Sequence, residues 1–187
     1  FLVLMPVGFA FAKISSKKTY LKPRQSPSTQ KLSSCAKNKT FFTVSPVDPS
    51  FIKTIAPLGN SNPPGHVLPT GHMYFYLEPQ TADMNSTMEI PVVSPGDVVV
   101  DSIVSSENVS AGVTDFSFYF SPCKEVRVKW GHISTLSSKL SAALGPIGNS
   151  SPNCMTYNTG GSTYRACSKD VAVKIKAGER MGTIIKQ

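Results

Sequence analysis

The chain has 187 residues and a formal charge of +8, so it is long enough to bury its own core, and disulfides would supplement that core without replacing it. Charged residues make up only 16% of the chain, while Ser, Thr, Pro, Gly and Asn fill much of the rest, which is typical of many short strands joined by turns. No repeat at solenoid or propeller period is present, which excludes those repeat architectures.

The positive charge belongs to the N-terminal part of the chain. Residues 1–53 hold nine basic side chains and one acid, Asp48, whereas residues 54–187 hold ten side chains of each sign. We therefore expect a basic Pro/Ser/Lys-rich arm over 1–53 and a separate domain over 54–187. The arm is either a solvated tail or a binding segment for an acidic polysaccharide or a similar polyanion. Nucleic acid is not expected as a partner, because no aromatic residues are interleaved for base stacking.

The first twelve residues, FLVLMPVGFAFA, are apolar and end in a small-x-small pattern similar to the end of a secretory signal. They are too short to span a bilayer as a helix, so no transmembrane span is expected. Pro6 and Gly8 disfavour a helix, which favours an extended strand.

An apolar strand of this kind has to be buried, either on its own domain or in a groove of a neighbouring subunit. In the second case it would add to an exposed sheet edge and build a homo-oligomer or a fibre. The side chains that would make this contact are Phe1, Leu2, Val3, Leu4, Val7, Phe9 and Phe11.

Strand patterns follow along the chain. Residues 41–71 carry frequent prolines and short apolar patches, which indicates an edge strand followed by a long loop. Alternation and β-branched or aromatic content predict five further strands, and Phe116 to Phe120 should alternate between core and surface. The five segments are 72–79 (HMYFYLEP), 88–93 (MEIPVV), 97–107 (DVVVDSIVSSE), 114–122 (TDFSFYFSP) and 125–134 (EVRVKWGHIS).

One helix is predicted within 135–145 (TLSSKLSAALG), because Leu136, Leu140 and Leu144 recur every four residues and Gly145 then ends it. Residues 170–184 (DVAVKIKAGERMGTI) alternate again and predict a final hairpin with its turn at 177–179. The predicted fold class is therefore all-β with one short helix and an extended N-terminal arm.

The four cysteines lack the CxxC spacing of a zinc ribbon or a redox site. Cys154 and Cys167 flank two Thr/Tyr-rich arms around an Asn-Thr-Gly-Gly turn, so a disulfide closing that hairpin is the first expectation. Cys35 and Cys123 would then pair and tie the arm to the domain. Four cysteines allow three connectivities, so the other two pairings remain open.

Export is also indicated by Asn-x-Ser/Thr sequons in a chain with eight asparagines, more than chance alone would give. Such sequons imply surface loops and a glycosylating, secretory setting, so we expect an extracellular or cell-surface location. The four acceptor residues are Asn38, Asn85, Asn108 and Asn149.

The order of these segments resembles the lysostaphin-type (LytM-like) zinc endopeptidases. The resemblance rests on 91–100 (PVVSPGDVVV), on 129–134 (KWGHIS), which is similar to the family's YxHLS strand end, and on 171–184 (VAVKIKAGERMGTI), which is similar to its glycine-containing hairpin. It covers roughly residues 66–187 and is closest to an outlying branch without an assigned function. It implies a small β-barrel or sandwich of the lipoyl-like kind.

The resemblance also implies a zinc site, which the residues fill only in part. His72 matches the first ligand of the family's HxxxD motif, but Tyr76 stands where the carboxylate ligand should be, and the chain contains no HxH. His132 matches a catalytic histidine that is not a ligand, and His66 could approach His72. Because catalytic zinc needs three protein ligands and an open position, one matched ligand cannot hold it.

Two functions therefore remain as candidates for this chain. The first is a secreted, glycosylated, non-catalytic structural or binding module without a cofactor, which assembles through residues 1–12. The alternative is a zinc-dependent peptidoglycan endopeptidase whose remaining ligands lie outside this chain. Under the first function, His72 is a half-buried imidazole at a strand start and His132 simply ends a strand.

Overall fold

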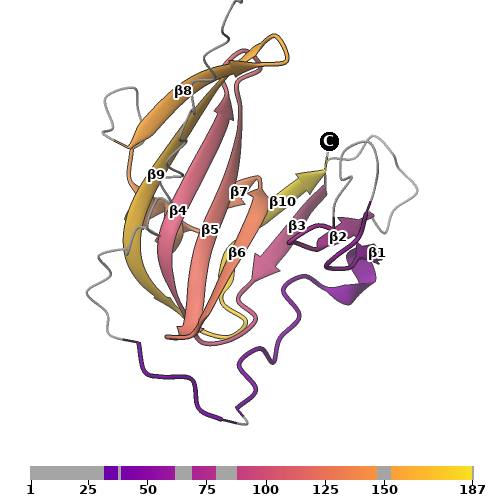
Figure 1. Cartoon of the computed structure of the whole chain (residues 1–187), viewed down its shortest axis with the longest axis vertical. Helices are drawn as coiled ribbons and strands as arrows, with labels where there is room; N and C mark the ends of the chain where they lie inside the picture. The colour runs from indigo at the N-terminus through magenta and orange to yellow at the C-terminus, as the bar shows by residue number, and fades with distance from the viewer. Residues whose placement is uncertain (1–31, 38, 62–68, 79–87, 147–152, 187) are drawn as a thin grey trace, which may run out of the picture.

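The computed structural model describes residues 32–186 except residue 38 and the segments 62–68, 79–87 and 147–152. In this part of the chain the strands form three sheets of two, three and five strands. Figure 1 shows the five-stranded sheet as a long twisted layer, with the smaller sheets beside its lower part. The upper ends of the long strands extend beyond the smaller sheets.

The five-stranded sheet is antiparallel throughout, in the order β6-β5-β4-β9-β8. Side chains alternate between its two faces, so Phe118 and Phe120 are buried on the inner face while Tyr119 between them lies on the outer face. Its strands are β4 (Val98–Asn108), β5 (Val113–Cys123), β6 (Val126–Ile133), β8 (Cys154–Thr159) and β9 (Ser162–Ile175).

The three-stranded sheet has the order β3-β10-β7 and covers part of the inner face. Its strands are β3 (Met88–Val93), β7 (Thr135–Leu136) and β10 (Arg180–Lys186), and the helix α1 (Ser138–Leu144) follows β7 directly. Ser137 caps α1, because its side chain accepts from Leu140 N, and Gly145 ends the helix at φ 66°. Leu140 and Leu144 are the buried residues of the helix.

The hydrophobic core lies between these two sheets and α1. Gly182 on β10 shows how close the layers are, because a Cβ there would lie 2.3 Å from the Thr135 carbonyl oxygen. A larger residue at this position would push β7 away. The core cluster consists of Val47, Ile90, Val92, Val98, Val100, Ile103, Phe118, Phe120, Ile133, Leu140, Leu144, Ile175 and Met181.

The two-stranded sheet pairs β1 (Ile52–Ala56) with β2 (Tyr74–Leu77), and the 3-10 helix η1 (Pro49–Phe51) precedes β1. The predicted domain boundary after residue 53 falls inside β1, and Val47 of the predicted arm belongs to the core cluster. The arm residues just before η1 therefore pack on the domain.

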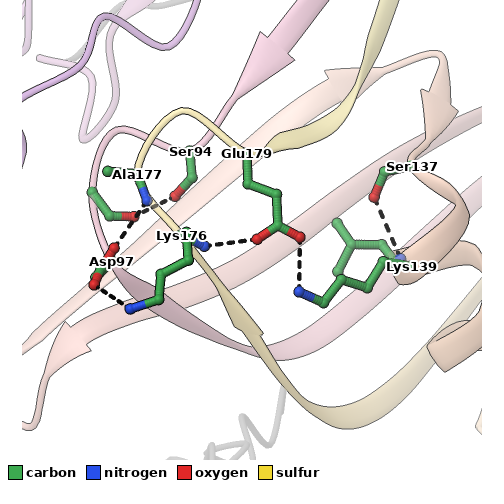
Figure 2. Close-up of polar contacts among 9 residues, drawn as sticks. Ser94, Asp97, Ser137, Lys139, Lys176, Ala177 and Glu179 are labelled. Atoms are coloured by element: carbon green, nitrogen blue, oxygen red, sulfur yellow. Dashed lines mark hydrogen bonds and ion pairs between the residues drawn. The ribbon is translucent and has the colours of Figure 1, made fainter.

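Polar contacts join the turn before β4 to the turn between β9 and β10 (Figure 2). Asp97 accepts from Lys176 Nζ at 2.8 Å and from the Ala177 amide at 3.0 Å, and the Gly178 amide donates to the Ser94 carbonyl at 2.9 Å. Glu179 accepts from the Lys176 amide and from Lys139 Nζ, which links this turn to α1. These bonds hold the two sheets together at the end opposite the long hairpin tips.

The prediction of an all-β fold with one short helix is confirmed. The described strands form three open sheets and no closed barrel, so the barrel detail of the prediction is not confirmed. The prediction of a final hairpin is wrong. The turn lies at 177–178 as expected, but β9 pairs with β4 and β8 whereas β10 pairs with β3 and β7.

Both predicted disulfides are present. Cys154–Cys167 joins directly opposed residues of β8 and β9, whose two-residue turn at Gly160 and Gly161 has positive φ at both positions, as a tight hairpin requires. Cys35–Cys123 joins the segment before η1 to the end of β5.

Within the described residues, no helix is long and apolar enough to cross a lipid bilayer.

The disulfides should differ in their contribution to stability, because they close loops of very different length, with sequence separations of 88 and 13. Loop entropy predicts that replacing both members of Cys35–Cys123 by alanine costs about 4.5 kcal/mol of unfolding free energy, against about 3 kcal/mol for Cys154–Cys167. Urea titration of the two double variants measures this. The opposite order, or a different pairing in non-reducing peptide maps, contradicts the account.

Candidate functional site

The structure brings His72 and His132 to the same small aromatic cluster. His72 lies two residues before β2, and its ring centroid is 4.9 Å from that of Tyr74. His132 lies near the end of β6, and its ring centroid is 6.4 Å from that of Tyr74. Tyr76, on the same face of β2, extends the cluster at 6.0 Å from Tyr74.

A β-bulge places His132 on the outer face of the five-stranded sheet. The register shifts between Phe116 and Phe118, so β6 carries an extra residue there, and Gly131 packs against the Ser117 hydroxyl. His132 has φ 61°, and within the described segments no other residue except glycine has a positive φ. Its Nδ1 lies 3.1 Å from Asp115 Oδ2 on the neighbouring strand. Such backbone outliers concentrate at functional sites, which makes this position a candidate.

The electrostatics of the pair are set mainly by burial. Desolvation raises the pKa of the Asp115 carboxyl above its ordinary value of 3.8, and the smaller opposing effects of His132, the Phe116 amide and Lys129 do not cancel it. The His132 side chain is 77% exposed. The pair is therefore a half-exposed contact that places the imidazole, and it adds little to stability.

The predicted zinc ligands are not brought into a complete set by the described residues. In the described segments, one group of three ligand-type side chains lies close together, namely Cys35, Cys123 and Glu125. Its cysteines form a disulfide, and Glu125 accepts a hydrogen bond of 2.6 Å from the Cys35 amide, so it is no metal site. The Tyr76 hydroxyl replaces the expected carboxylate, and His66 lies outside the described residues.

A groove that the sequence did not reveal lies on the inner face of the same sheet, where the long strands extend past the smaller sheets (Figure 1). Its volume is about 530 Å³. Its lining comes from β4, β5, β7, β9 and α1 with their flanks: Ser105, Glu107, Thr114, Phe116, Ser134, Thr135, Leu136, Ser141, Leu144, Gly145, Arg165 and Cys167. The lining residues span 62 positions, from Ser105 to Cys167, so only the strand register brings them together.

The two edges of the five-stranded sheet differ in charge. The edge strand β6 carries Arg127 and Lys129, both over the Tyr119 ring, and Arg127 also donates to Asp101 through two nitrogens. The opposite edge strand, β8, has no charged residue, and Met155 is 64% and Tyr157 40% exposed. Charged edge residues prevent pairing with other chains, so β8 is the less protected edge.

Of the predicted glycosylation sites, only Asn108 lies within the described residues. It ends β4, and its Oδ1 accepts from the Ala111 amide at 3.1 Å in the turn before β5. Asn38, Asn85, Asn149 and the predicted assembly segment 1–12 lie outside the described residues.

Comparison with protein-family models, with curated proteins and with solved structures found no match for this chain.

We predict that Asp115→Asn leaves the unfolding free energy at pH 7 unchanged or raises it by up to about 1 kcal/mol. The carboxylate is half-exposed, and its favourable contacts offset the cost of its partial burial only in part. The raised folded-state pKa means that the penalty is absent well below pH 3.8 and grows as pH rises through the folded value. Urea titrations at pH 3 and pH 7 measure the difference.

Asp97→Asn is the matched control, because the pKa of Asp97 is shifted in the opposite direction to that of Asp115. Lys176 and the Ala177 amide hold the pKa of Asp97 below 3.8, so its contribution is present above that pH and is lost as pH falls through the folded value. Asp97→Asn should therefore lose stability at pH 7. A loss at pH 7 for Asp115→Asn of more than about 1 kcal/mol would show that its ion pair with His132 outweighs burial.

Proposed function

We propose that this chain is a secreted or cell-surface, glycosylated, non-catalytic module that assembles with copies of itself through residues 1–12. Two disulfides support an oxidising compartment, because such bonds are rare in the reducing cytosol. Asn108 ends β4, so a glycan on its sequon would extend from the end of the sheet.

The observation that carries the proposal is the uncharged edge of β8. A strand at a sheet edge presents unpaired backbone groups, and β8 adds the exposed Met155 and Tyr157 without a lysine or arginine. The segment Phe1–Ala12 supplies the complementary feature, an uncharged apolar stretch. Backbone hydrogen bonds along β8 would give affinity, and alternate apolar side chains would give specificity.

The arm has the reach that this contact needs. Cys35 is fixed to Cys123, and the chain between residue 12 and Cys35 can extend by about 3.3 Å per residue. The segment 1–12 could therefore reach a neighbouring copy. Burial of five or six large apolar side chains would stabilise the contact by on the order of 10 kcal/mol before entropic costs. A head-to-tail contact of this kind that does not close builds a fibre.

The basic arm supports a second partner for the same module. Residues 1–53 concentrate nine basic side chains, so an acidic polysaccharide at the cell surface would be attracted to them. The attraction should weaken steeply with salt, since exposed charges are screened over about 8 Å at physiological ionic strength.

Light scattering tests the assembly. The full chain should show a mass that rises with concentration, and both deletion of residues 1–12 and the double variant Met155→Lys/Tyr157→Lys should leave a monomer, because lysines on β8 oppose a further strand. Leu58→Lys is the control, since Leu58, at 68%, is about as exposed as Met155 but lies after β1. A full chain that is monomeric at every concentration contradicts the proposal.

The aromatic cluster favours a zinc-dependent peptidoglycan endopeptidase as the second candidate, because the rings of His72 and His132 both lie near the Tyr74 ring. Tyr76 in place of a carboxylate argues against bound zinc. We predict that the purified chain cleaves neither glycine-rich nor murein peptides in a metal-dependent way. Turnover that a chelator abolishes and zinc restores, together with stoichiometric zinc that His72→Ala removes, would establish the enzyme instead.

A further inference from the structure

The groove on the inner face is built from two cross-strand rows of the five-stranded sheet. In the first row Glu107 of β4 lies opposite Thr114 of β5 and Arg165 of β9. In the second row Ser105 lies opposite Phe116 and Cys167. Directly opposed residues share one face of a sheet, so both rows form the floor of the groove, and β7 and α1 form its wall.

The lining is polar but carries no net charge. Arg165 donates to Glu107 through Nε at 3.0 Å and through Nη2, so the single anion and the single cation of the lining neutralise each other. Both bonds end on Oε2, and within the described part of the chain no donor reaches Oε1 of Glu107. This carboxylate oxygen can therefore accept from a ligand.

Ser105 supplies an independent sign of a ligand. The residue is only 4% exposed, and its hydroxyl has no hydrogen-bond partner in the described segments. Buried polar groups are nearly always paired, so an unpaired hydroxyl on the floor of a groove indicates a missing partner. The hydroxyls of Thr114 and Ser141 line the same space, and Phe116, Leu136 and Leu144 supply its apolar surface.

We propose that this groove binds a neutral saccharide. A charged ligand would find no unpaired charge among the lining residues, and the nearby Lys169 ammonium already donates to the Leu144 carbonyl. A purely apolar ligand would leave the hydroxyls and Glu107 Oε1 unsatisfied. An added peptide strand would find no free backbone groups, because β4, β5 and β9 are already paired along the floor. A sugar ring offers hydroxyls at its edge and C–H groups on its face, which match the polar rows and the Phe116 ring.

The groove also has a suitable size. Its volume of about 530 Å³ lies within the range of about 300–1,000 Å³ typical of small-molecule sites. It faces away from Asp115 and His132, which lie on the outer face of the same strands, and the proposal does not depend on assembly through β8.

The test uses the purified full chain and a panel of neutral oligosaccharides built from glucose, mannose, galactose, xylose and N-acetylglucosamine. Sialylated and sulfated glycans form the anionic arm, and fatty acids and unglycosylated peptides form the remaining arms. Fluorescence anisotropy or calorimetry should detect at least one neutral oligosaccharide. Ser105→Ala should weaken its binding by about threefold to tenfold, the loss of one hydrogen bond, and Thr114→Val by a similar factor.

Ser117→Ala is the matched control, because Ser117 lies on the outer face of β5 next to Phe116 and should leave binding unchanged. Thermal unfolding of each variant checks that it is folded, and Phe116→Ala adds information only where it folds. Binding confined to anionic glycans, fatty acids or peptides overturns the proposal. So does the absence of binding across the neutral panel, or binding that Ser105→Ala and Thr114→Val leave unchanged.

Discussion

The packing of the β5 phenylalanines against the three-stranded sheet is the contact on which the rest of the structure depends. Phe118 and Phe120 are completely buried, and the Phe120 and Trp130 rings are nearly perpendicular at a centroid distance of 5.3 Å. Aromatic residues dominate core energetics, so this cluster fixes where the small sheet lies. That sheet covers only part of the inner face. Phe116, which precedes Phe118 by two residues on the same face of β5, therefore borders an open groove.

The same strands therefore carry two candidate sites on opposite faces. On the outer face the bulge in β6 places His132 beside Asp115 and Tyr74, with the imidazole exposed. On the inner face, Ser105 and Glu107 lie in a neutral, hydroxyl-lined groove. In the outer cluster Tyr76 stands at the position where the second zinc ligand, a carboxylate, is expected, whereas the groove requires no further group to bind a ligand. This difference is why we propose a binding module and not a peptidase.

Local patterns predicted the elements but not their partners. Alternation identified β5 and β6, and the turn at Gly160–Gly161 identified the hairpin that Cys154–Cys167 closes. The alternation of β9 and β10 could not reveal that they enter different sheets, because pairing depends on distant strands. The groove was missed for the same reason: Glu107 meets Arg165 only through the β4–β9 register.

Hydrogen exchange of the β8 amides tests the central proposal most directly, since strand addition would protect those that point away from β9. For the full chain, the account predicts that this protection of 154–159 grows with protein concentration and is absent after deletion of residues 1–12. Equal exchange at all concentrations and in both proteins, or protection that appears on the β6 edge instead, would contradict assembly through β8.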